Sequence, residues 1–414
     1  MPSHPCETSM FPLCHCSCCQ TIISTIGNEP RNTLGGLEMK TVEETPGVTI
    51  EEKKESPEYV RTSLAAAMTM GKIPGKFYRD AKLYCINLLL TYDEGCHAKC
   101  AYCGLSGSRE VDTDWVDSSF IRVDWPVFSI EEIKTALTDG TCPHVERTCI
   151  SMITLGNARE DCISVVSQLK GVIPRISVLI TPTIINKDWL IRVKEAGADK
   201  VGIAVDAATE EIFDKVRGKD VQGPHKWSKY WQTVEESVEV FGPDNTGIHL
   251  IVGIGETEKE MLETIQRAQD LGARTHLFSF FPEEGSVMED HPQPPLGAYR
   301  RVQLARYIIN YNIGSYRDMK FNEIGQLTDF GLTPEEYERV LNIGEAFMTS
   351  GCKGETIDNA CNRPMGNCTP FQASVGHWRN FPINPNEDDM KKLREQLNDY
   401  SLTYEVDESY LDDD

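Results

Sequence analysis

Three cysteines lie within eight residues in the stretch GCHAKCAYCG, residues 95–104. Cys96, Cys100 and Cys103 stand too close along the chain to brace a fold by disulfides. Structural zinc takes four ligands and catalytic zinc takes three with an open position, whereas a [4Fe–4S] cluster held at three corners keeps one iron free. The spacing therefore favours a [4Fe–4S] cluster. A zinc site completed by His97 and plain unligated thiols are the alternatives.

A second group of cysteines, Cys352, Cys361 and Cys368, lies in GCKGETIDNACNRPMGNC. The glycines and the proline between them allow this segment, residues 352–368, to wrap around a second [4Fe–4S] cluster, with Arg363 beside it. Three unligated thiols on a loop are the alternative. Catalysis by Arg363 near this cluster is a further expectation.

Composition limits the classes of function that these thiols serve. The chain has 414 residues, 40% of them hydrophobic, and a net charge of −23, which disfavours nucleic acid or an anionic membrane as partner. Its 15 cysteines are clustered, and no apolar run is long enough to span a membrane. A reducing cytoplasm, in which clustered thiols bind metal, is the expected location.

The pattern between the cysteine groups predicts an α/β fold, because short apolar runs alternate with amphipathic helical stretches. Eight strands are expected, at residues 84–92, 149–155, 176–181, 200–206, 247–255, 275–281, 319–325 and 345–351. Eight such units fit a (β/α) TIM-type barrel, full or nearly full, with its chemistry on the loops after the strands. The first cysteine group follows the first strand and the second follows the eighth, so both are expected at that end.

Three regions are expected along the chain. Residues 1–57 are predicted to be a disordered, cysteine-containing leader, and residues 58–384 the barrel. Residues 385–414 carry eleven acidic and three basic side chains and are expected to form a solvated, flexible C-terminal tail.

The motif Cys96-x3-Cys100-x2-Cys103, with Tyr102 before the last cysteine, resembles the signature of radical S-adenosylmethionine (radical SAM) enzymes. The resemblance implies that SAM binds the free iron and is cleaved to a 5′-deoxyadenosyl radical, which removes hydrogen from carbon. It also implies cofactor contacts at positions that match the family's motifs. These positions are Tyr102, Gly156, Asn157, Asp206, Arg217, Gly253 and Glu256.

Several of these residues have plainer readings. Glu256 would cap the following helix, Asp206 would be a helix N-cap, and Arg217 a surface charge. Other polar side chains are candidates for the cavity wall, each with an ordinary packing or surface role as the alternative. These are His249, His276, Arg300, Arg306, Arg363 and Glu323.

The segments ACNRPMGN and FMTSGC, together with residues 61–96, are similar to the two-component lipoyl synthases of the biotin synthase branch. That similarity implies two [4Fe–4S] clusters, the second sacrificed as a sulfur source for an octanoyl chain on a carrier-protein lysine. Its implied partners are a homologous second subunit, an octanoylated lipoyl carrier and a low-potential electron donor such as ferredoxin or flavodoxin.

Three other readings stay open. Cys85 and Cys149 lie on predicted strands, so a biotin-synthase-like site is one of them, although ordinary core packing is expected for both. Another is a related radical SAM enzyme that rearranges or methylates its substrate. The third, of a different class, is a non-enzymatic iron–sulfur or zinc scaffold.

Overall fold

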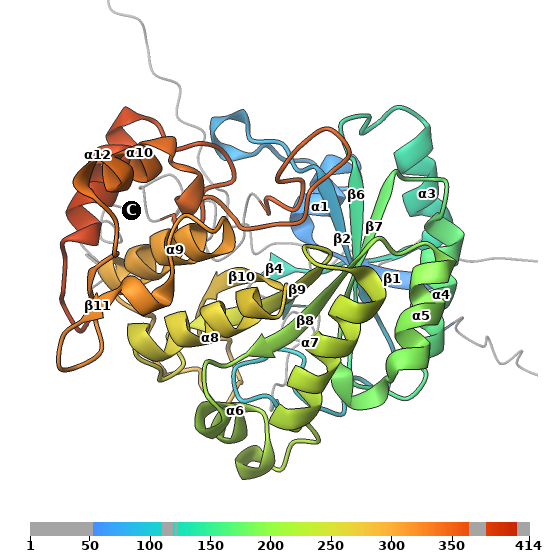
Figure 1. Ribbon diagram of the computed structural model, residues 1–414. Coiled ribbons are helices and arrows are strands. Elements are labelled where there is room, and N and C mark those ends of the chain that lie inside the picture. The colour runs from blue at the N-terminus through green and yellow to red at the C-terminus, as the bar shows by residue number, and fades with distance from the viewer. Residues whose placement is uncertain (1–52, 110–118, 121–122, 364–377, 404–414) are drawn as a thin grey trace, which may run out of the picture. The chain divides into compact units, whose positions relative to one another are not determined.

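The computed structural model describes residues 53–109, 119–120, 123–363 and 378–403 (Figure 1). Most of the predicted leader, the distal part of the acidic tail and Cys368 lie outside the described residues. The fold below concerns the described part of the chain.

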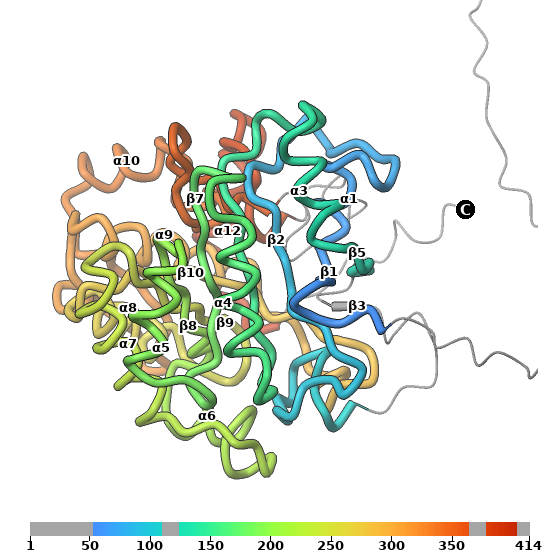
Figure 2. Tube along the Cα trace, turned by 90° about the vertical axis from the view of Figure 1, so that its right-hand side faces the viewer, coloured from blue at the N-terminus to red at the C-terminus, as the bar shows by residue number. Residues whose placement is uncertain are grey.

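An eight-stranded sheet forms the centre of the fold, in the order β10-β9-β8-β7-β6-β2-β1-β5. Its parallel strands are β2 (Cys85–Leu90), β6 (Arg147–Ser151), β7 (Arg175–Ile180), β8 (Lys200–Asp206), β9 (Thr246–Val252) and β10 (Arg274–Ser279). Two antiparallel strands, β1 (Tyr59–Thr62) and β5 (Val127–Ser129), extend the sheet beyond β2. Figure 2 shows β1 and β5 at one side of the sheet and β8, β9 and β10 at the other.

Six of the predicted strands are confirmed as this parallel series, because their apolar runs are buried. All six residues of β2, for example, are buried. The prediction of a seventh and an eighth barrel strand is wrong. At 319–325 a short strand, β11 (Lys320–Phe321), pairs only with β12 (Leu327–Asp329) in a separate hairpin. At 345–351 the chain starts with a 3₁₀ helix, η5 (Glu345–Phe347). Short apolar runs do not by themselves distinguish a strand from a helical turn.

Helices connect the strands and pack against the sheet (Figure 1). The α-helices are α1 (Leu64–Thr69), α3 (Ile130–Thr138), α4 (Ala158–Leu169), α5 (Lys187–Ala196), α6 (Glu210–Val216), α7 (Trp227–Phe241), α8 (Glu258–Asp270), α9 (Leu296–Asn310), α10 (Pro334–Ile343) and α12 (Glu387–Leu397). Short elements complete the described chain: β3 (Ser119–Phe120), β4 (Val123–Asp124), η1 (Tyr78–Asp80), η2 (Pro182–Ile184), η3 (Lys219–Val221) and η4 (Tyr316–Asp318).

Two buried arginines of helix α9 were candidates for the cavity wall in the sequence, but they bind other parts of the chain. Arg300 donates to the Gln396 side chain and to the Arg379 carbonyl, and Arg306 donates to the Ala346 carbonyl. Neither residue lines the cavity described below. Their placement in the cavity wall is therefore wrong, and they serve packing between α9 and the C-terminal segments.

The acidic segment is not entirely a solvated tail. Residues 387–397 form α12, which packs on α9 and buries Leu393 and Leu397 (Figure 1). Three acidic side chains lie in its first turn, where the positive end of the helix dipole stabilises negative charge. Arg394 of α12 forms an ion pair with Glu338 of α10 at 2.7 Å. The acidity that suggested a flexible tail thus belongs in part to the N-terminus of a packed helix.

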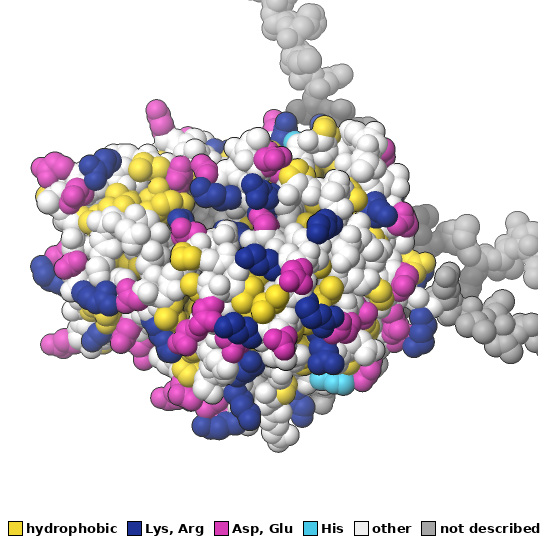
Figure 3. All heavy atoms as spheres, turned by 45° about the vertical axis from the view of Figure 1, so that its right-hand side comes forward, with side chains coloured by type: hydrophobic (Ala, Val, Ile, Leu, Met, Phe, Trp, Pro, Cys, Tyr) yellow, Lys and Arg dark blue, Asp and Glu magenta, His cyan; other side chains and the backbone are white. Residues whose placement is uncertain are grey.

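One face of the molecule carries charges of both signs, mixed rather than separated. On the face drawn in Figure 3, Lys and Arg side chains are interspersed with Asp and Glu side chains. Among the described residues, no helix combines the length and apolarity that crossing a membrane requires.

Candidate active site

One face of the sheet lines a cavity of about 270 Å³. All six parallel strands contribute residues to its wall. Cys96, Cys100 and Cys103 line this cavity, and so do Cys352 and Cys361. Two cysteine groups about 250 residues apart in sequence therefore face one space.

The first cysteine group lies on the loop after β2, as predicted. Backbone hydrogen bonds fix this loop on three sides: His97 N to Thr154 O at 2.9 Å, Ala101 N to Val216 O at 2.7 Å, and Met288 N to Ala101 O at 3.0 Å. Gly107 crosses so close to Cys96 that an added Cβ would lie 2.7 Å from the Cys96 carbonyl oxygen. The loop is therefore built to hold its thiols in place.

The three thiols sit in an environment suited to a cluster. The Sγ atoms of Cys96 and Cys103 each accept a hydrogen bond of 3.4 Å, from the backbone N–H of Thr154 and Leu105 respectively. Burial raises the pKa of the Cys100 thiol to about 11 and that of Cys103 well above its usual range. The protein alone therefore keeps these two groups protonated, and iron would bind them as thiolates.

The geometry does not favour the zinc alternative. His97 does not line the cavity, and its Nε2 lies 2.8 Å from the exposed carboxylate of Glu94. Among the described residues, no three Cys, His, Asp or Glu side chains converge as the ligands of one metal ion do. The thiolates of a [4Fe–4S] cluster bind different irons, so the cluster does not require that convergence.

A buried polar network stands beside the first cysteine group. The Tyr102 hydroxyl donates to Asp206 at 2.5 Å, and Arg217 donates to the same carboxylate oxygen at 2.5 Å. Arg217 also donates to the Tyr230 hydroxyl at 2.9 Å and lies over the Tyr230 ring. Tyr102, Asp206 and Arg217 all line the cavity.

The plainer readings of Asp206 and Arg217 are wrong. Arg217 is only 4% exposed, so it is not a surface charge. The N-cap of α6 is Thr209, not Asp206. Asp206 instead has a left-handed backbone, with φ of 65° at the end of β8. Strain of this kind is common at functional sites.

Four other residues predicted to contact the cofactor lie outside the cavity wall. Gly156 and Asn157 are exposed, and Asn157 stands at the N-cap of α4 without a side-chain cap bond. Glu256 accepts hydrogen bonds from Gly253 N and Ile254 N, at 2.7 and 3.1 Å, and so ties the turn after β9. Thr257 caps α8, so the prediction that Glu256 caps this helix is also wrong.

Cys352 and Cys361, the described members of the second cysteine group, lie at the opposite end of the strands from the predicted one. Arg147, the first residue of β6, donates to the Lys353 carbonyl at 2.5 Å. Glu146, just before it, accepts hydrogen bonds from the backbone N–H groups of Glu355, Thr356 and Ile357. The expectation that both cysteine groups share the C-terminal end of the strands is wrong, because these long-range contacts draw the loop to the strand starts.

Residues 350–362 bridge the first and last parallel strands at this end. The Leu277 N–H of β10 donates to the Ser350 hydroxyl at 3.0 Å, and the Asn362 side chain donates to the Lys82 carbonyl before β2 at 2.6 Å. Inside the loop, an added Cβ at Gly351 would lie 2.1 Å from the Cys361 carbonyl oxygen, so close approach requires glycine there. Cys368 lies outside the described residues.

Two strand cysteines join the second group. Cys149 lines the cavity, and the Asn87 Nδ2 lies 3.9 Å from Cys85 Sγ and 3.7 Å from Cys361 Sγ. A hydrogen bond from Cys85, with help from nearby Arg363 and Asn87, lowers the pKa of Cys361 to about 6. Cys85 is buried, as expected, whereas Cys149 is only half-buried, and both are neighbours of Cys361. The sequence alone does not show the register of β2 against β6, so this neighbourhood could not be predicted from it.

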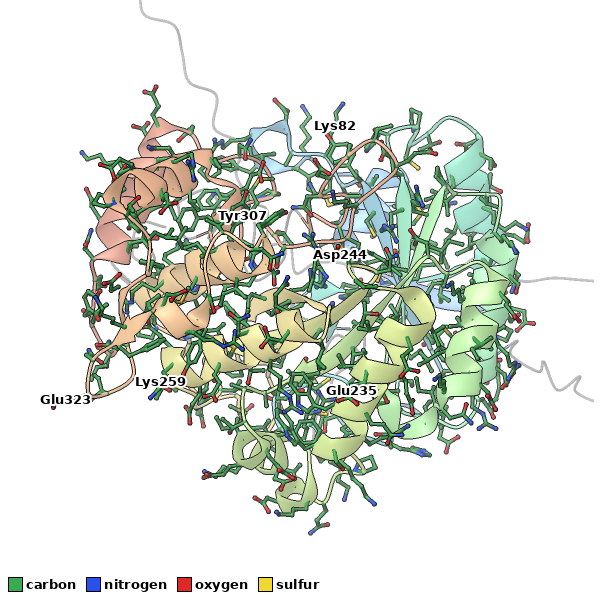
Figure 4. The ribbon with its side chains drawn as sticks, in the orientation of Figure 1. Lys82, Glu235, Asp244, Lys259, Tyr307 and Glu323 are labelled. Carbon is green, nitrogen blue, oxygen red and sulfur yellow. The ribbon has the colours of Figure 1, made fainter. Side chains whose placement is uncertain are left out.

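Polar and aromatic side chains complete the wall. His249, His276 and Arg363 line the cavity, together with the unpredicted Phe278 and Phe280. Glu323 does not line it, and Figure 4 shows this side chain at the outer edge of the molecule. The spacing of two from His276 to Phe278 to Phe280, along β10 and just beyond it, is the signal that would have found the aromatic residues.

The comparisons with known proteins agree with the motif. Residues 92–268 match the family model described as "Radical SAM superfamily". A GTP 3′,8-cyclase of Rippkaea orientalis (strain PCC 8801 / RF-1) is 33% identical over 72 residues, which cover 17% of this chain and 21% of that protein. The chain thus matches about a fifth of the length of this curated relative.

Two solved structures match this chain at low similarity. HydG, a maturase of the [FeFe]-hydrogenase, is 13% identical with a TM-score of 0.44, over 59% of this chain and 54% of that one. Methylornithine synthase (PylB) is 13% identical with a TM-score of 0.40, over 67% of this chain and 84% of that one.

Proposed function

We propose that this chain, which carries a radical SAM domain over residues 92–268, is an enzyme that removes a hydrogen atom from a small organic substrate in the cavity between its two cysteine groups. When bound, a [4Fe–4S] cluster and SAM supply a 5′-deoxyadenosyl radical for that step. Three thiols lining one cavity are the single observation that carries the proposal. Rearrangement or methyl transfer of the substrate are both compatible with this reading.

Each part of the site has a role in this reading. Cys96, Cys100 and Cys103 would hold the cluster, since their loop is fixed by backbone hydrogen bonds. Tyr102, Asp206 and Arg217 present polar groups beside them for the polar parts of SAM. The apolar wall keeps water away from a reactive carbon radical, and the exclusion of water prevents side reactions.

Formation of 5′-deoxyadenosine tests the proposal. The protein is reconstituted with iron and sulfide under anaerobic conditions, reduced with dithionite, and incubated with SAM. We expect 5′-deoxyadenosine and methionine from the wild type and a loss of at least about a hundredfold for Cys100→Ala. Cys142→Ala is the matched control, because Cys142 is also buried but lies outside the cavity wall. Equal product from all three proteins would sink the proposal.

Sulfur insertion is a second candidate, favoured by one observation: Cys149, Cys352 and Cys361 face the same cavity as the first cysteine group. A second [4Fe–4S] cluster on Cys352, Cys361 and Cys368, with Arg363 near it, would place sulfide within reach of a substrate radical. This candidate is a lipoyl synthase subunit that acts on an octanoyl chain of a carrier-protein lysine. It requires a homologous second subunit and a low-potential donor such as ferredoxin or flavodoxin.

An octanoyl-lysyl peptide separates the two candidates. The reconstituted protein is incubated with the peptide, its partner subunit, SAM and reductant, and the peptide mass is measured. A gain of sulfur, lost in Cys361→Ala but kept in Cys142→Ala, supports sulfur insertion. Formation of 5′-deoxyadenosine with an unchanged peptide mass excludes it and leaves the first candidate.

A further inference from the structure

Arg363 is a cation on the cavity wall without a carboxylate to balance it. Its guanidinium carbon lies 5.0 Å from the centre of the Phe278 ring, a distance at which the ring makes a cation–π contact with it. Among the described residues it has no ion pair and no hydrogen bond. Its backbone is left-handed, with φ of 42°, a conformation that is uncommon for a residue with a side chain.

The nearby carboxylates are not positioned to serve Arg363. Of the described residues that line the cavity, only Asp206 and Glu283 carry carboxylates. Asp206 is paired with Arg217, and Glu283 lies close enough to Cys103 to raise the pKa of that thiol. The segment that follows Arg363, residues 364–377, contains no Asp or Glu. Arg363 is half-buried, and Cys361, whose thiol pKa it helps to lower, is an acidic group near it. The guanidinium N–H groups of Arg363 still have no oxygen acceptor among the described residues, so the cavity favours an occupant that brings acceptor oxygens, above all a carboxylate.

His249 adds a second polar group beside this cation. Its ring lies 5.1 Å from the Phe278 ring, and neither ring nitrogen has a hydrogen-bond partner among the described residues. Burial first, and then the charge of Arg363, lowers the pKa of His249 to about 3, so the ring is neutral near pH 7. It is therefore free to donate one hydrogen bond to a ligand without adding charge. His276 differs, because its Nδ1 contacts the Ser350 carbonyl oxygen.

The rest of this end of the cavity is apolar. Ile251, Leu179 and Phe278 contribute to its wall. A few convergent polar groups on an otherwise apolar wall are typical of a site that orients a small ligand by one polar end. The Cys96–Cys103 loop lies on the same cavity, so a ligand held at Arg363 would direct its apolar part into the space shared with that loop.

We propose that the substrate is a small organic acid with an apolar body, held by its carboxylate on Arg363 and His249, with the body along Phe278 and Ile251. This inference rests on the proposed function for the identity of the cavity as the active site. It assigns Arg363 to substrate binding rather than to a second cluster. It also favours a free acid over the octanoyl amide of a carrier lysine, which has no carboxylate.

Octanoate and its neutral counterpart octanamide test this proposal. Their binding to the anaerobically reconstituted protein is measured by equilibrium dialysis at about pH 8, where the acid is fully ionised. We expect the wild type to bind octanoate about 10- to 100-fold more tightly than octanamide, the range for a hydrogen bond to a charged group. Arg363→Gln should remove that preference, and Arg363→Lys, which keeps the cation, should restore part of it.

Arg339→Gln is the matched control, because Arg339 is an exposed arginine on α10, and it should keep the wild-type preference. A wild type that does not bind octanoate, or that binds both probes equally, overturns the proposal. So does an Arg363→Gln variant that keeps the preference. Loss of bound iron in Arg363→Gln would assign this arginine to the second cysteine group and likewise refute it. None of these measurements depends on SAM cleavage. A negative binding result would therefore refute this inference without refuting the proposed function.

Discussion

Replacing Arg217 with methionine should destabilise the protein severely while leaving its surface unchanged. Arg217 and Asp206 form a buried ion pair with exposures of 4% and 8%, and the Arg217 guanidinium also bonds the Ala204 carbonyl and the Tyr230 hydroxyl. Methionine keeps the apolar stem but removes every one of these bonds. The Asp206 carboxylate is then left buried, and among the described residues it keeps a hydrogen bond from the Tyr102 hydroxyl.

The expected loss of stability follows from the unpaired charge that the substitution leaves on Asp206. Removing one partner of a buried ion pair costs about 3–5 kcal/mol. For a chain of this size that corresponds to a fall of roughly 3–6 °C in the melting temperature. The double variant Arg217→Met/Asp206→Asn removes both charges, and we expect it to recover about half or more of the lost stability.

Urea unfolding of the metal-free protein, followed by circular dichroism, gives the free energies. Arg192→Met is the matched control, since Arg192 pairs with Glu160 at 2.5 Å on the exposed surface, where such a pair is worth about 0–1 kcal/mol. Two results would contradict a stabilising role for the buried network. The first is a free energy of unfolding that falls no more in Arg217→Met than in Arg192→Met. The second is a double variant that is less stable than Arg217→Met.

The remaining predictions concern the two loops and one buried carboxyl. Glu146→Gln should weaken the bonds to the backbone N–H groups of residues 355–357, and faster amide exchange of Ile357 at unchanged exchange in β2 would show it. Gly107→Ala should lower iron incorporation, because its Cβ would meet the Cys96 carbonyl oxygen at 2.7 Å; full iron loading would contradict this. Burial raises the pKa of Glu256 from an ordinary value of 4.5 to about 7. Its contribution to stability is therefore complete below pH 4.5 and lost as the pH rises through about 7, so the stability advantage of the wild type over Glu256→Gln should fall across that window in unfolding experiments. A difference that is constant with pH would refute the shift.

The first cysteine group was predictable because its chemistry is local. Cys96, Cys100 and Cys103 belong to one loop after a strongly apolar strand, so spacing and position in the strand order were enough. The six parallel strands were predictable for a similar reason, since each is a continuous buried run. Local pattern also gave the helices that separate them.

The second group was not predictable in the same way. Whether Cys352 and Cys361 lie at one end of the strands or the other is decided by Glu146 and Arg147, more than 200 residues earlier. The neighbourhood of Cys85, Cys149 and Cys361 likewise depends on strand register and loop closure. Helix α12 was not predicted because the acids of its first turn also resemble a solvated tail.

The electron paramagnetic resonance spectrum of the reduced, reconstituted protein tests the central claim most directly, namely that Cys96, Cys100 and Cys103 hold a [4Fe–4S] cluster with one open iron. The account predicts a [4Fe–4S]⁺ signal whose g values change when SAM is added, and loss of that SAM-dependent change in Cys100→Ala but not in Cys142→Ala. A spectrum that SAM leaves unaltered in the wild type would contradict it.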